Sequence, residues 1–310
     1  MPSTSEHPPI PPATVLICSR ERPAMLLDTV DSVLAGATVP AEILVVDQSQ
    51  APHNALDRMG EVRGCSVRYR PFAKPGLSRA RNVGLREARE DVVVLLDDDM
   101  FVAPDWLPLL LGGLADDPRG VATGRVLAAP NEGGEGLVPA AALVQRTEPA
   151  VYRGPQAFDV VPGANVALWR ETALALGGYD ERLGAGTRFA AADDNDMGHR
   201  LLQAGCEVRF VPAAVVYHRA WRAPDELLRL RWNYGRGKGG FYAKHAGLRD
   251  RRMLRRAAID GVRRVKRAVV SLPRSPRDAV AELVSLAGLL AGALDWLVRE
   301  RILDRDAGSP

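Results

Sequence analysis

The feature that most constrains this fold is a series of short apolar runs, rich in β-branched residues, each of which ends at a polar or acidic residue. Three runs cover residues 14–18, 42–46 and 91–96, and a shorter one covers 67–69. Apolar runs without alternating polarity are typical of strands that are buried on both faces of a sheet. Segments 23–35 and 78–88 between them have the apolar spacing of helices. This order predicts an α/β fold in which a mostly parallel sheet lies between helices.

The chain divides into three regions by composition. Residues 1–12 are rich in Pro and lack a signal-peptide pattern, so we expect a disordered lead-in. Residues 13–222 continue the α/β pattern, and residues 223–310 form a basic, helical C-terminal extension. Within the second region we expect a mobile loop at 129–140, ordered structure over 158–169, one or two strands within 207–217, and helices near 170–176 and 194–204. The three cysteines have no metal-type spacing and are expected to be reduced: Cys18, Cys65 and Cys206.

Acidic residues follow two of the predicted strands. Asp47 ends the second strand, and the consecutive Asp97, Asp98 and Asp99 end the strand at 91–96. Ligands of such sheets bind outside the carboxyl ends of the strands. Adjacent carboxylates raise one another's pKa unless a cation neutralises them, and oxygen ligands suit Mg²⁺ or Mn²⁺. A metal bound by Asp97 and Asp99, or by Asp99 alone, could stabilise a diphosphate leaving group, and a solvated acidic turn is the alternative.

A second acidic cluster, Asp193-Asp194-Asn195-Asp196, opens a predicted helix. Carboxylates at a helix N-terminus are ordinary caps. A carboxylate that faces another across a cleft is also what a base-catalysed displacement needs, so both interpretations stay open. His218 follows an apolar strand and is either a structural histidine or a third metal ligand.

At these residues the chain resembles the family 2 glycosyltransferases of the GT-A fold, over roughly residues 14–221. No single motif is specific, since Asp-x-Asp is abundant by chance, but seven motifs occur in the order of the family. They are TVLICSRERP, ILVVDQS, GLSRARNVGLREA, VVVLLDDDMFVAPDWL, VPGANVALWRE, GGYDERL and ADDNDMGHRLLQAG.

The resemblance implies a role for each matching residue. It assigns Asp194, or its neighbour Asp193, as the general base, and Asp97, Asp99 and His218 as ligands of Mn²⁺ or Mg²⁺. It assigns the nucleotide-sugar donor to a set of residues around the strand ends, and the acceptor to a loop. The donor set is Ser19, Arg20, Asp47, Arg81, Asn82, Asp97 and Asp98, and the acceptor set is Gly163, Ala164 and Asn165.

Two departures from the family pattern affect these assignments. Asp193-Asp194 stands where the family usually has Glu-Asp, and Asp47-Gln48-Ser49 replaces a more usual Asp-Asp or Asp-Asn. The Gln-x-x-Arg-Trp motif of processive members is absent. The resemblance therefore implies an inverting enzyme that transfers a single sugar from a nucleotide-diphospho-sugar to an acceptor hydroxyl, in cell-surface polysaccharide or glycolipid synthesis.

The net charge of +3 conceals a strong segregation. Residues 1–218 carry 20 Lys and Arg against 28 Asp and Glu, or −8, whereas residues 219–310 carry 21 against 10, or +11. The largely apolar stretch 279–297 is borderline for a membrane span. We predict a cytoplasmic protein whose extension lies at an anionic membrane surface, and a solvated basic helix is the alternative. The glycine-rich segment 234–245 is expected to form a turn between helices, with Arg236 or Lys238 over the diphosphate.

Three other functional classes can be weighed on the same residues. A dinucleotide-dependent oxidoreductase would need Gly-x-Gly-x-x-Gly after the first strand, where the chain has SRERP. Nucleic-acid binding is not expected, because the basic stretch lacks aromatic residues and no known module is present. A non-catalytic module that binds sugar nucleotides or membranes remains the alternative, although it would not need both acidic clusters.

Overall fold

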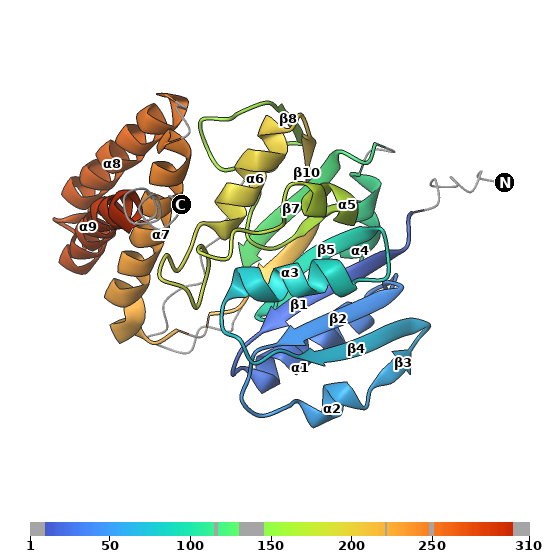
Figure 1. The fold of residues 1–310 in the computed structure, drawn as a ribbon. Helices are drawn as coiled ribbons and strands as arrows, with labels where there is room; N and C mark the ends of the chain where they lie inside the picture. Colours follow the sequence, from blue (N-terminus) through green and yellow to red (C-terminus); the bar gives the residue numbers. More distant parts are fainter. Residues whose placement is uncertain (1–9, 115–116, 130–145, 221, 248–250, 300–310) are drawn as a thin grey trace, which may run out of the picture.

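The computed structural model describes residues 10–114, 117–129, 146–220, 222–247 and 251–299. Its centre is a ten-stranded sheet with the strand order β3-β4-β2-β1-β5-β9-β7-β10-β6, and β8 pairs with β10 (Figure 1). The loop predicted at 129–140 lies, except for Ala129, outside the described residues, as does most of the N-terminal lead-in.

The first half of the sheet is parallel, as the apolar runs predict. Strands β4, β2, β1 and β5 lie side by side in parallel register, and their side chains are buried in the hydrophobic core on both faces of the sheet. Two helices, α1 and α3, pack on this half of the sheet (Figure 1). The elements are β1 (Ala13–Ser19), α1 (Pro23–Leu34), β2 (Glu42–Asp47), α2 (Asn54–Asp57), β3 (Gly60–Val62), β4 (Cys65–Pro71), α3 (Leu77–Glu87) and β5 (Val92–Asp97).

The second half of the sheet is mixed, so the sheet is less parallel than the sequence predicts. Strand β9 runs antiparallel to both β5 and β7, and β6 and β8 run antiparallel to β10. These strands are too short or too irregular to show in an apolar run. The elements are β6 (Met100–Val102), α4 (Trp106–Gly112), β7 (Gly120–Ala128), β8 (Ala150–Arg153), β9 (Val166–Trp169), α5 (Arg170–Ala175), α6 (Asp193–Gln203) and β10 (Glu207–His218).

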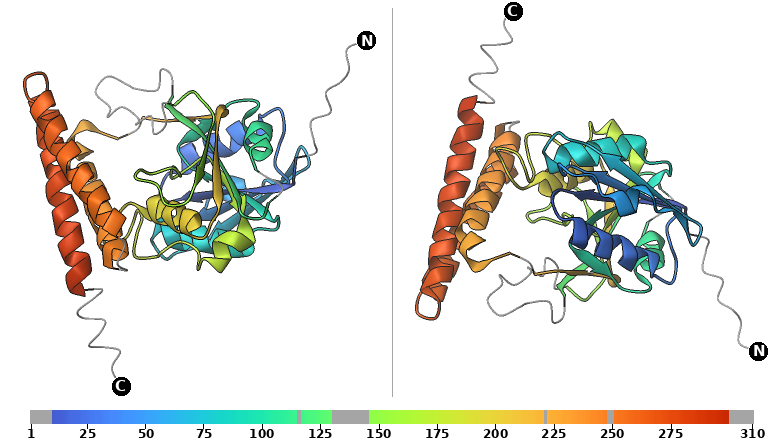
Figure 2. Two further views of the ribbon diagram at one scale, coloured as in Figure 1. Left: turned by 90° about the horizontal axis from the view of Figure 1, so that it is seen from above. Right: turned by 90° about the horizontal axis from the view of Figure 1, so that it is seen from below.

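The C-terminal helices form a separate layer beside the sheet. After the short 3-10 helix η1 (Pro224–Glu226) come α7 (Leu227–Gly247), α8 (Arg251–Ser271) and α9 (Pro276–Val298). The views from above and below show these long helices lying alongside one another at one edge of the body, with α7 nearest to α6 (Figure 2). The three cysteines are buried and free.

The predicted turn at residues 234–245 is wrong, because this segment lies inside α7. Its glycines are explained by close helix packing instead of by turn geometry. A Cβ atom on Gly235 would lie 2.1 Å from the carbonyl oxygen of Ser285, and one on Gly239 would lie 2.0 Å from that of Leu289. Gly288 and Gly292 of α9 face α7 in the same way, so both helices carry a Gly-x-x-x-Gly pair at their contact.

Candidate active site

The three consecutive aspartates at the end of β5, Asp97 to Asp99, contact different neighbours. Asp98 is buried and turned inward, where it accepts a hydrogen bond of 2.6 Å from Ser19 Oγ. Burial raises the pKa of the Asp98 carboxyl to about 7. Asp97 is partly exposed and accepts a 3.1 Å bond from Arg81. Burial also raises the pKa of Asp97, more than the nearby Arg81 lowers it.

Asp99 meets two groups that come from distant parts of the chain. Antiparallel pairing of β10 with β6 places His218 opposite Met100, so that His218 Nε2 lies 3.6 Å from Asp99 Oδ1. Arg22, the residue before α1, donates to Asp99 Oδ2 at 2.9 Å and lies 3.1 Å from Asp98 Oδ1. Arg22 was not among the residues that the sequence suggested. The structure thus joins Asp99 and His218, two of the predicted metal ligands.

The donor set at Asp99 fits a divalent cation completed by substrate. In the described part of the chain, no group of three or more His, Cys, Asp or Glu side chains is arranged to hold a metal. One carboxylate, from Asp99, and one imidazole, whose Nε2 faces that carboxylate, are then the protein ligands available for a cation. Mn²⁺ accepts both ligand types, and sites of this kind commonly use phosphate oxygens for the other positions. Asp97, the other predicted ligand, is held by Arg81 instead.

The second acidic cluster opens α6 and also distributes its carboxylates. Asp193 is buried and paired with Arg81 at 2.7 Å. Asp194 is half-buried and, within the described residues, has no hydrogen-bond or ion-pair partner. Burial, and then the charge of Asp193, raise the pKa of Asp194 to about 7. Ala192, just before the helix, has a left-handed φ of 70°, a strained conformation of the kind that is concentrated at functional sites.

Arg81 connects the two clusters. Its guanidinium contacts Asp97 and Asp193, and it also donates to the carbonyl of Gly163 at 2.6 Å. Burial alone would lower the pKa of the Arg81 guanidinium. The neighbouring carboxylate of Asp193 outweighs this effect and raises the pKa above its ordinary value, so Arg81 stays charged. A Cβ on Gly163 would lie 3.6 Å from Asp194 Oδ2. The predicted acceptor loop therefore reaches the predicted base.

The remaining predicted donor residues occupy varied positions at the strand ends. Ser19 and Asp47 are buried, and Asp47 accepts a 2.8 Å bond from Tyr69 Oη. Arg20 is exposed. Asn82 binds the backbone of Tyr179 through both its amide atoms, at 2.9 and 2.7 Å. Its observed role is to hold that turn, and its nucleotide contact stays a prediction.

The other two acceptor-loop residues are interior. Ala164 is buried, and Asn165 is completely buried with a left-handed φ of 61°. The Asn165 side chain accepts from Trp106 Nε1 at 2.7 Å and donates to the carbonyls of Arg125 and Ala214. Asn165 thus fixes the junction of β7, β9 and β10, and of the three residues only Gly163 adjoins Asp194.

Comparison with known proteins agrees with this geometry. Residues 92–297, about two thirds of the chain, match the model of the glycosyl transferase family group 2, and residues 14–166 match that of glycosyl transferase family 2. The chain belongs to glycosyltransferase family 2. The fold and the family that the sequence predicted are therefore confirmed.

Two curated relatives of this family 2 chain are named for different glycosyl transfer reactions. The chain is 30% identical over 181 residues to the pre-mycofactocin glycosyltransferase of Mycobacterium tuberculosis, a match that covers 57% of this chain and 37% of the relative. It is 26% identical over 232 residues to the glucosyl-dolichyl phosphate glucuronosyltransferase of Haloferax volcanii. That match covers 71% of this chain and 71% of the relative. The chain thus spans little more than a third of the length of the mycobacterial relative.

Solved structures of glycosyltransferases share the fold. A crystal structure of GalNAc-T7 with UDP, GalNAc and Mn²⁺ superposes with a TM-score of 0.56 at 21% identity, over 98% of this chain and 59% of that one. Staphylococcus aureus TarS superposes with a TM-score of 0.52 at 9% identity, over 92% and 91%. These likenesses confirm a GT-A-type fold for this family 2 chain.

Two residues of the C-terminal extension that the sequence placed over the diphosphate, Arg236 and Lys238, have other partners in the structure of this family 2 member. Arg236 pairs with Asp295 and Lys238 pairs with Asp159, each at 2.5 Å.

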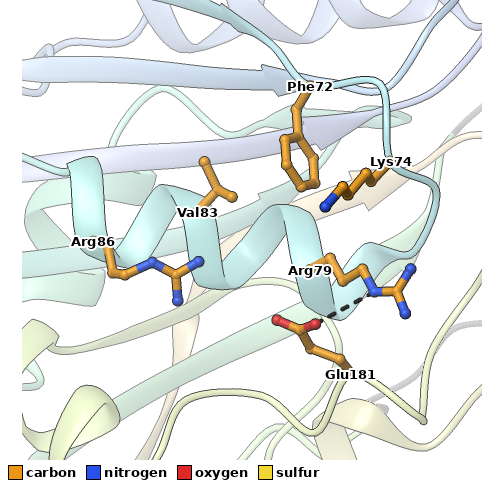
Figure 3. A pocket seen from close by; sticks show the side chains of 6 residues that line it. All are labelled: Phe72, Lys74, Arg79, Val83, Arg86 and Glu181. Atoms are coloured by element: carbon orange, nitrogen blue, oxygen red, sulfur yellow. Dashed lines mark ion pairs between the residues drawn. The ribbon is translucent and has the colours of Figure 1, made fainter.

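A pocket of this chain lies away from the acidic clusters. It has a volume of about 540 Å³ and opens beside the outer face of α3 (Figure 3). Arg79, Val83 and Arg86 come from the helix, and Arg79 pairs with Glu181 at 3.3 Å. None of the predicted site residues lines it. We refer to it as the α3 groove.

Proposed function

We propose that this chain is an inverting, metal-dependent glycosyltransferase that moves one sugar from a nucleotide-diphospho-sugar to an acceptor hydroxyl. The observation that carries the proposal is the contrast between Asp193 and Asp194. Arg81 holds Asp193, while Asp194 keeps its carboxylate beside Gly163 with no partner among the described residues. A base must be unoccupied and within reach of the proton that it accepts.

In this reaction Asp194 accepts the proton of the acceptor hydroxyl. The hydroxyl oxygen then bonds to the anomeric carbon while the bond from that carbon to the diphosphate oxygen breaks, which inverts the configuration. A pKa near 7 suits this task, because the carboxylate is a stronger base than an exposed one and is still available near neutral pH. Arg81 keeps Asp193 from competing for the proton.

Asp99 and His218 would hold the divalent cation, which offsets charge on the leaving diphosphate when bound. Arg22 contacts Asp98 and Asp99 from the loop after β1, so its guanidinium is placed to meet the same diphosphate. Ser19, Arg20 and Asp47 lie around this edge and would contact the nucleotide.

Purified protein assayed against a panel of nucleotide sugars, with Mn²⁺, Mg²⁺ or EDTA, tests the proposal. We expect one donor to be hydrolysed in a metal-dependent manner. Proton NMR of the sugar at the moment of release should show the anomer opposite to that of the donor. Retention of configuration would overturn inversion. Donor binding without any turnover would favour a non-catalytic sugar-nucleotide-binding module.

We also propose that the acceptor is glycan- or lipid-linked and serves cell-surface polysaccharide or glycolipid synthesis. The name of the Haloferax relative, glucosyl-dolichyl phosphate glucuronosyltransferase, gives that protein a lipid-linked acceptor. The present chain has a surface suited to such a molecule on its C-terminal helices.

That surface is an outer apolar ridge formed by α8 and α9. Its members on α8, together with Leu272 directly after that helix, follow a spacing of three, four or eight residues, and its α9 members follow three, four or seven, so each set lies on one side of its helix. Gly261 of α8 faces Leu286 of α9, which joins the two sides. The exposed members are Leu254, Val262, Val265, Val269, Leu272, Val280, Leu283, Leu290, Leu294 and Leu297.

The charged residues beside the apolar ridge indicate which kind of partner covers it. Arg255, Arg263, Lys266 and Arg267 are exposed on α8 beside its apolar side chains. A second copy of the chain would bring these cations against one another, whereas anionic lipid would pair with them, at about 1 kcal/mol for each. Helix α9 is long and apolar enough to cross a membrane, with a mean hydropathy of 1.6, but its glycine face packs on α7. We therefore propose that it lies in the interface at the cytoplasmic face of a membrane.

Sedimentation with vesicles tests this location. We expect binding to phosphatidylcholine vesicles that contain phosphatidylglycerol, and weaker binding as salt rises, because the screening length falls from about 10 Å at 0.1 M to 3 Å at 1 M. Leu294→Glu should reduce binding, whereas Leu109→Glu, at an exposed leucine of α4, should not. Equal sedimentation with neutral vesicles at low salt would overturn the electrostatic part of the proposal.

A further inference from the structure

A second pocket lies between the C-terminal helices and the segment that follows β8. It has a volume of about 240 Å³. Helix α8 supplies one wall, α7 another, and residues 157–159 the third. The lining residues are Ala157, Phe158, Asp159, Lys238, Tyr242, Arg256, Asp260, Arg263 and Arg264. We refer to it as the α8 pocket.

The charges of the α8 pocket do not cancel. Four cationic side chains face two carboxylates, which leaves a formal charge of +2. Asp159 takes two of the cations, Lys238 at 2.5 Å and Arg256. Burial alone would raise the pKa of Asp159, but these two cations lower it below its ordinary value. Asp260 pairs with Arg264 at 3.2 Å and accepts a 3.3 Å bond from Tyr242 Oη.

The fourth cationic side chain of the pocket, Arg263, is not paired with Asp159 or Asp260. Arg263 lines the pocket and is exposed, and it makes no hydrogen bond or ion pair with any other residue that the structure describes. An arginine that served only to hold α8 against the body of the protein would pair with a residue of the body. The excess positive charge is therefore open to a ligand at the mouth of the pocket.

The pocket adjoins the proposed base. Only three residues lie between Asp159 and Gly163, so their Cα atoms are at most about 14 Å apart. Val161 between them packs on Gly198 of α6, and Gly163 lies against Asp194. Lys238 and Asp159 are near enough to Asp194 that both shift its pKa, in opposite directions. One acceptor molecule can reach from the pocket to Asp194.

We propose that the α8 pocket binds a phosphate, or a comparable dianionic group, carried by the acceptor, and so positions the acceptor hydroxyl at Asp194. Arginine and lysine side chains bind phosphate through short, charge-assisted hydrogen bonds. The aromatic Phe158 and Tyr242 provide apolar surface for the part of the acceptor next to the phosphate. The inference rests on the proposed transferase function, since it identifies the acceptor class of the same site.

The α3 groove provides a matched control, because it also gathers cations: Lys74, Arg79 and Arg86 against Glu181 (Figure 3). Octyl phosphate and inorganic phosphate, added to the full chain, serve as probes in calorimetric titrations. We expect octyl phosphate to bind more tightly than inorganic phosphate. Arg263→Gln should weaken octyl phosphate binding about tenfold, the loss of one charge-assisted contact, while Arg86→Gln leaves it unchanged. Because Arg263 is exposed, its substitution leaves folding intact.

Donor hydrolysis separates this site from the diphosphate site. Octyl phosphate in the α8 pocket should leave metal-dependent donor hydrolysis nearly unchanged, whereas binding at the diphosphate site would inhibit it. Binding that Arg263→Gln does not weaken, or that Arg86→Gln weakens equally, would overturn the pocket assignment. If no donor is hydrolysed at all, the transferase proposal fails, and the titrations still report on the pocket.

Discussion

The two acidic clusters of this protein have similar sequences and opposite organisation. In Asp97-Asp98-Asp99 every carboxylate has a neighbour of opposite charge or a hydroxyl donor, and the carboxylate at the end of the run meets His218. In the cluster that opens α6, the first and last aspartates are held, and Asp194 is not. A run of acids is thus no site in itself. What matters is which neighbours the fold gives each member: Asp99 lies beside His218, and Asp194 has no hydrogen-bond or ion-pair partner among the described residues.

Arg81 accounts for much of this difference. It takes one carboxylate from each cluster, Asp97 and Asp193, and so directs chemistry to the remaining members. The arrangement suggests a division of labour, with charge neutralised by a cation at Asp99 and a proton accepted at Asp194. Substitutions in each cluster should therefore have different signatures.

Asp99→Asn should have the largest effect and abolish transfer together with metal-dependent nucleotide binding. The amide keeps the shape of the side chain but removes the charge that attracts the cation beside His218. Titration of Mn²⁺ and nucleotide into the variant measures this. Asp105→Asn, an exposed aspartate near the same edge, should behave like the unmodified protein. Unchanged turnover of Asp99→Asn with added Mn²⁺ would contradict the metal assignment.

Asp194→Asn should lower turnover by a factor on the order of 10² to 10⁴ and leave donor affinity nearly intact, because a base acts only in the transition state. Steady-state kinetics, combined with donor binding at equilibrium, separate the two quantities. Asp193→Asn should instead disturb Arg81, with which Asp193 pairs at 2.7 Å. A larger loss of turnover for Asp193→Asn than for Asp194→Asn would mean that the base is Asp193.

Asp196→Asn should affect stability instead of chemistry. This carboxylate is fully buried and is held by Arg200, Lys244 and His245 at 2.6 to 2.8 Å. Removal of one partner from such a network costs about 3 kcal/mol of unfolding free energy, measured in urea. Burial would raise the Asp196 pKa, but these partners lower it to about 2. The difference from the unmodified protein should be complete above the ordinary value of 3.8 and disappear as the pH falls through 2. Loss of donor hydrolysis without loss of stability would contradict this structural role.

The smallest predicted effect concerns the pH dependence of turnover. Turnover should rise as the pH rises through about 7, as Asp194 loses its proton. Burial, Asp193 and Asp159 raise this pKa, and Lys238 and Arg81 lower it. Lys238→Gln should therefore move the acidic limb of the profile upward, and Asp159→Asn should move it downward, each by about half a pH unit. Shifts of the same sign for both variants would show that the limb belongs to another group.

The sequence predicted the parallel half of the fold and the two acidic clusters well, because apolar runs and strand ends are local signals. It could not predict β9 or the pairing of β6 with β10, which depend on contacts between distant segments. His218 could be suspected from its strand, but only that pairing brings it to Asp99. Arg22 was missed, although it lies in the quoted loop SRERP, because nothing local distinguishes it from Arg20.

The glycine-rich segment of α7 shows why a local rule can fail. Glycine favours turns when only the chain around it is considered. Here Gly235 and Gly239 are required by backbone atoms of α9, a helix some fifty residues later in the chain.

Contact between α7 and α9 also has a consequence for how the extension responds to its surroundings. Backbone meets backbone there, with no side chain at Gly235, Gly239, Gly288 or Gly292 to separate the helices. Packing of this kind depends on dispersion forces between closely spaced atoms and not on the burial of apolar side chains away from water. It should therefore keep its strength whether solvent or hydrocarbon surrounds α9. A membrane on the outer side of α9 should therefore leave the contact of α9 with α7 unchanged, and α7 keeps its place beside α6.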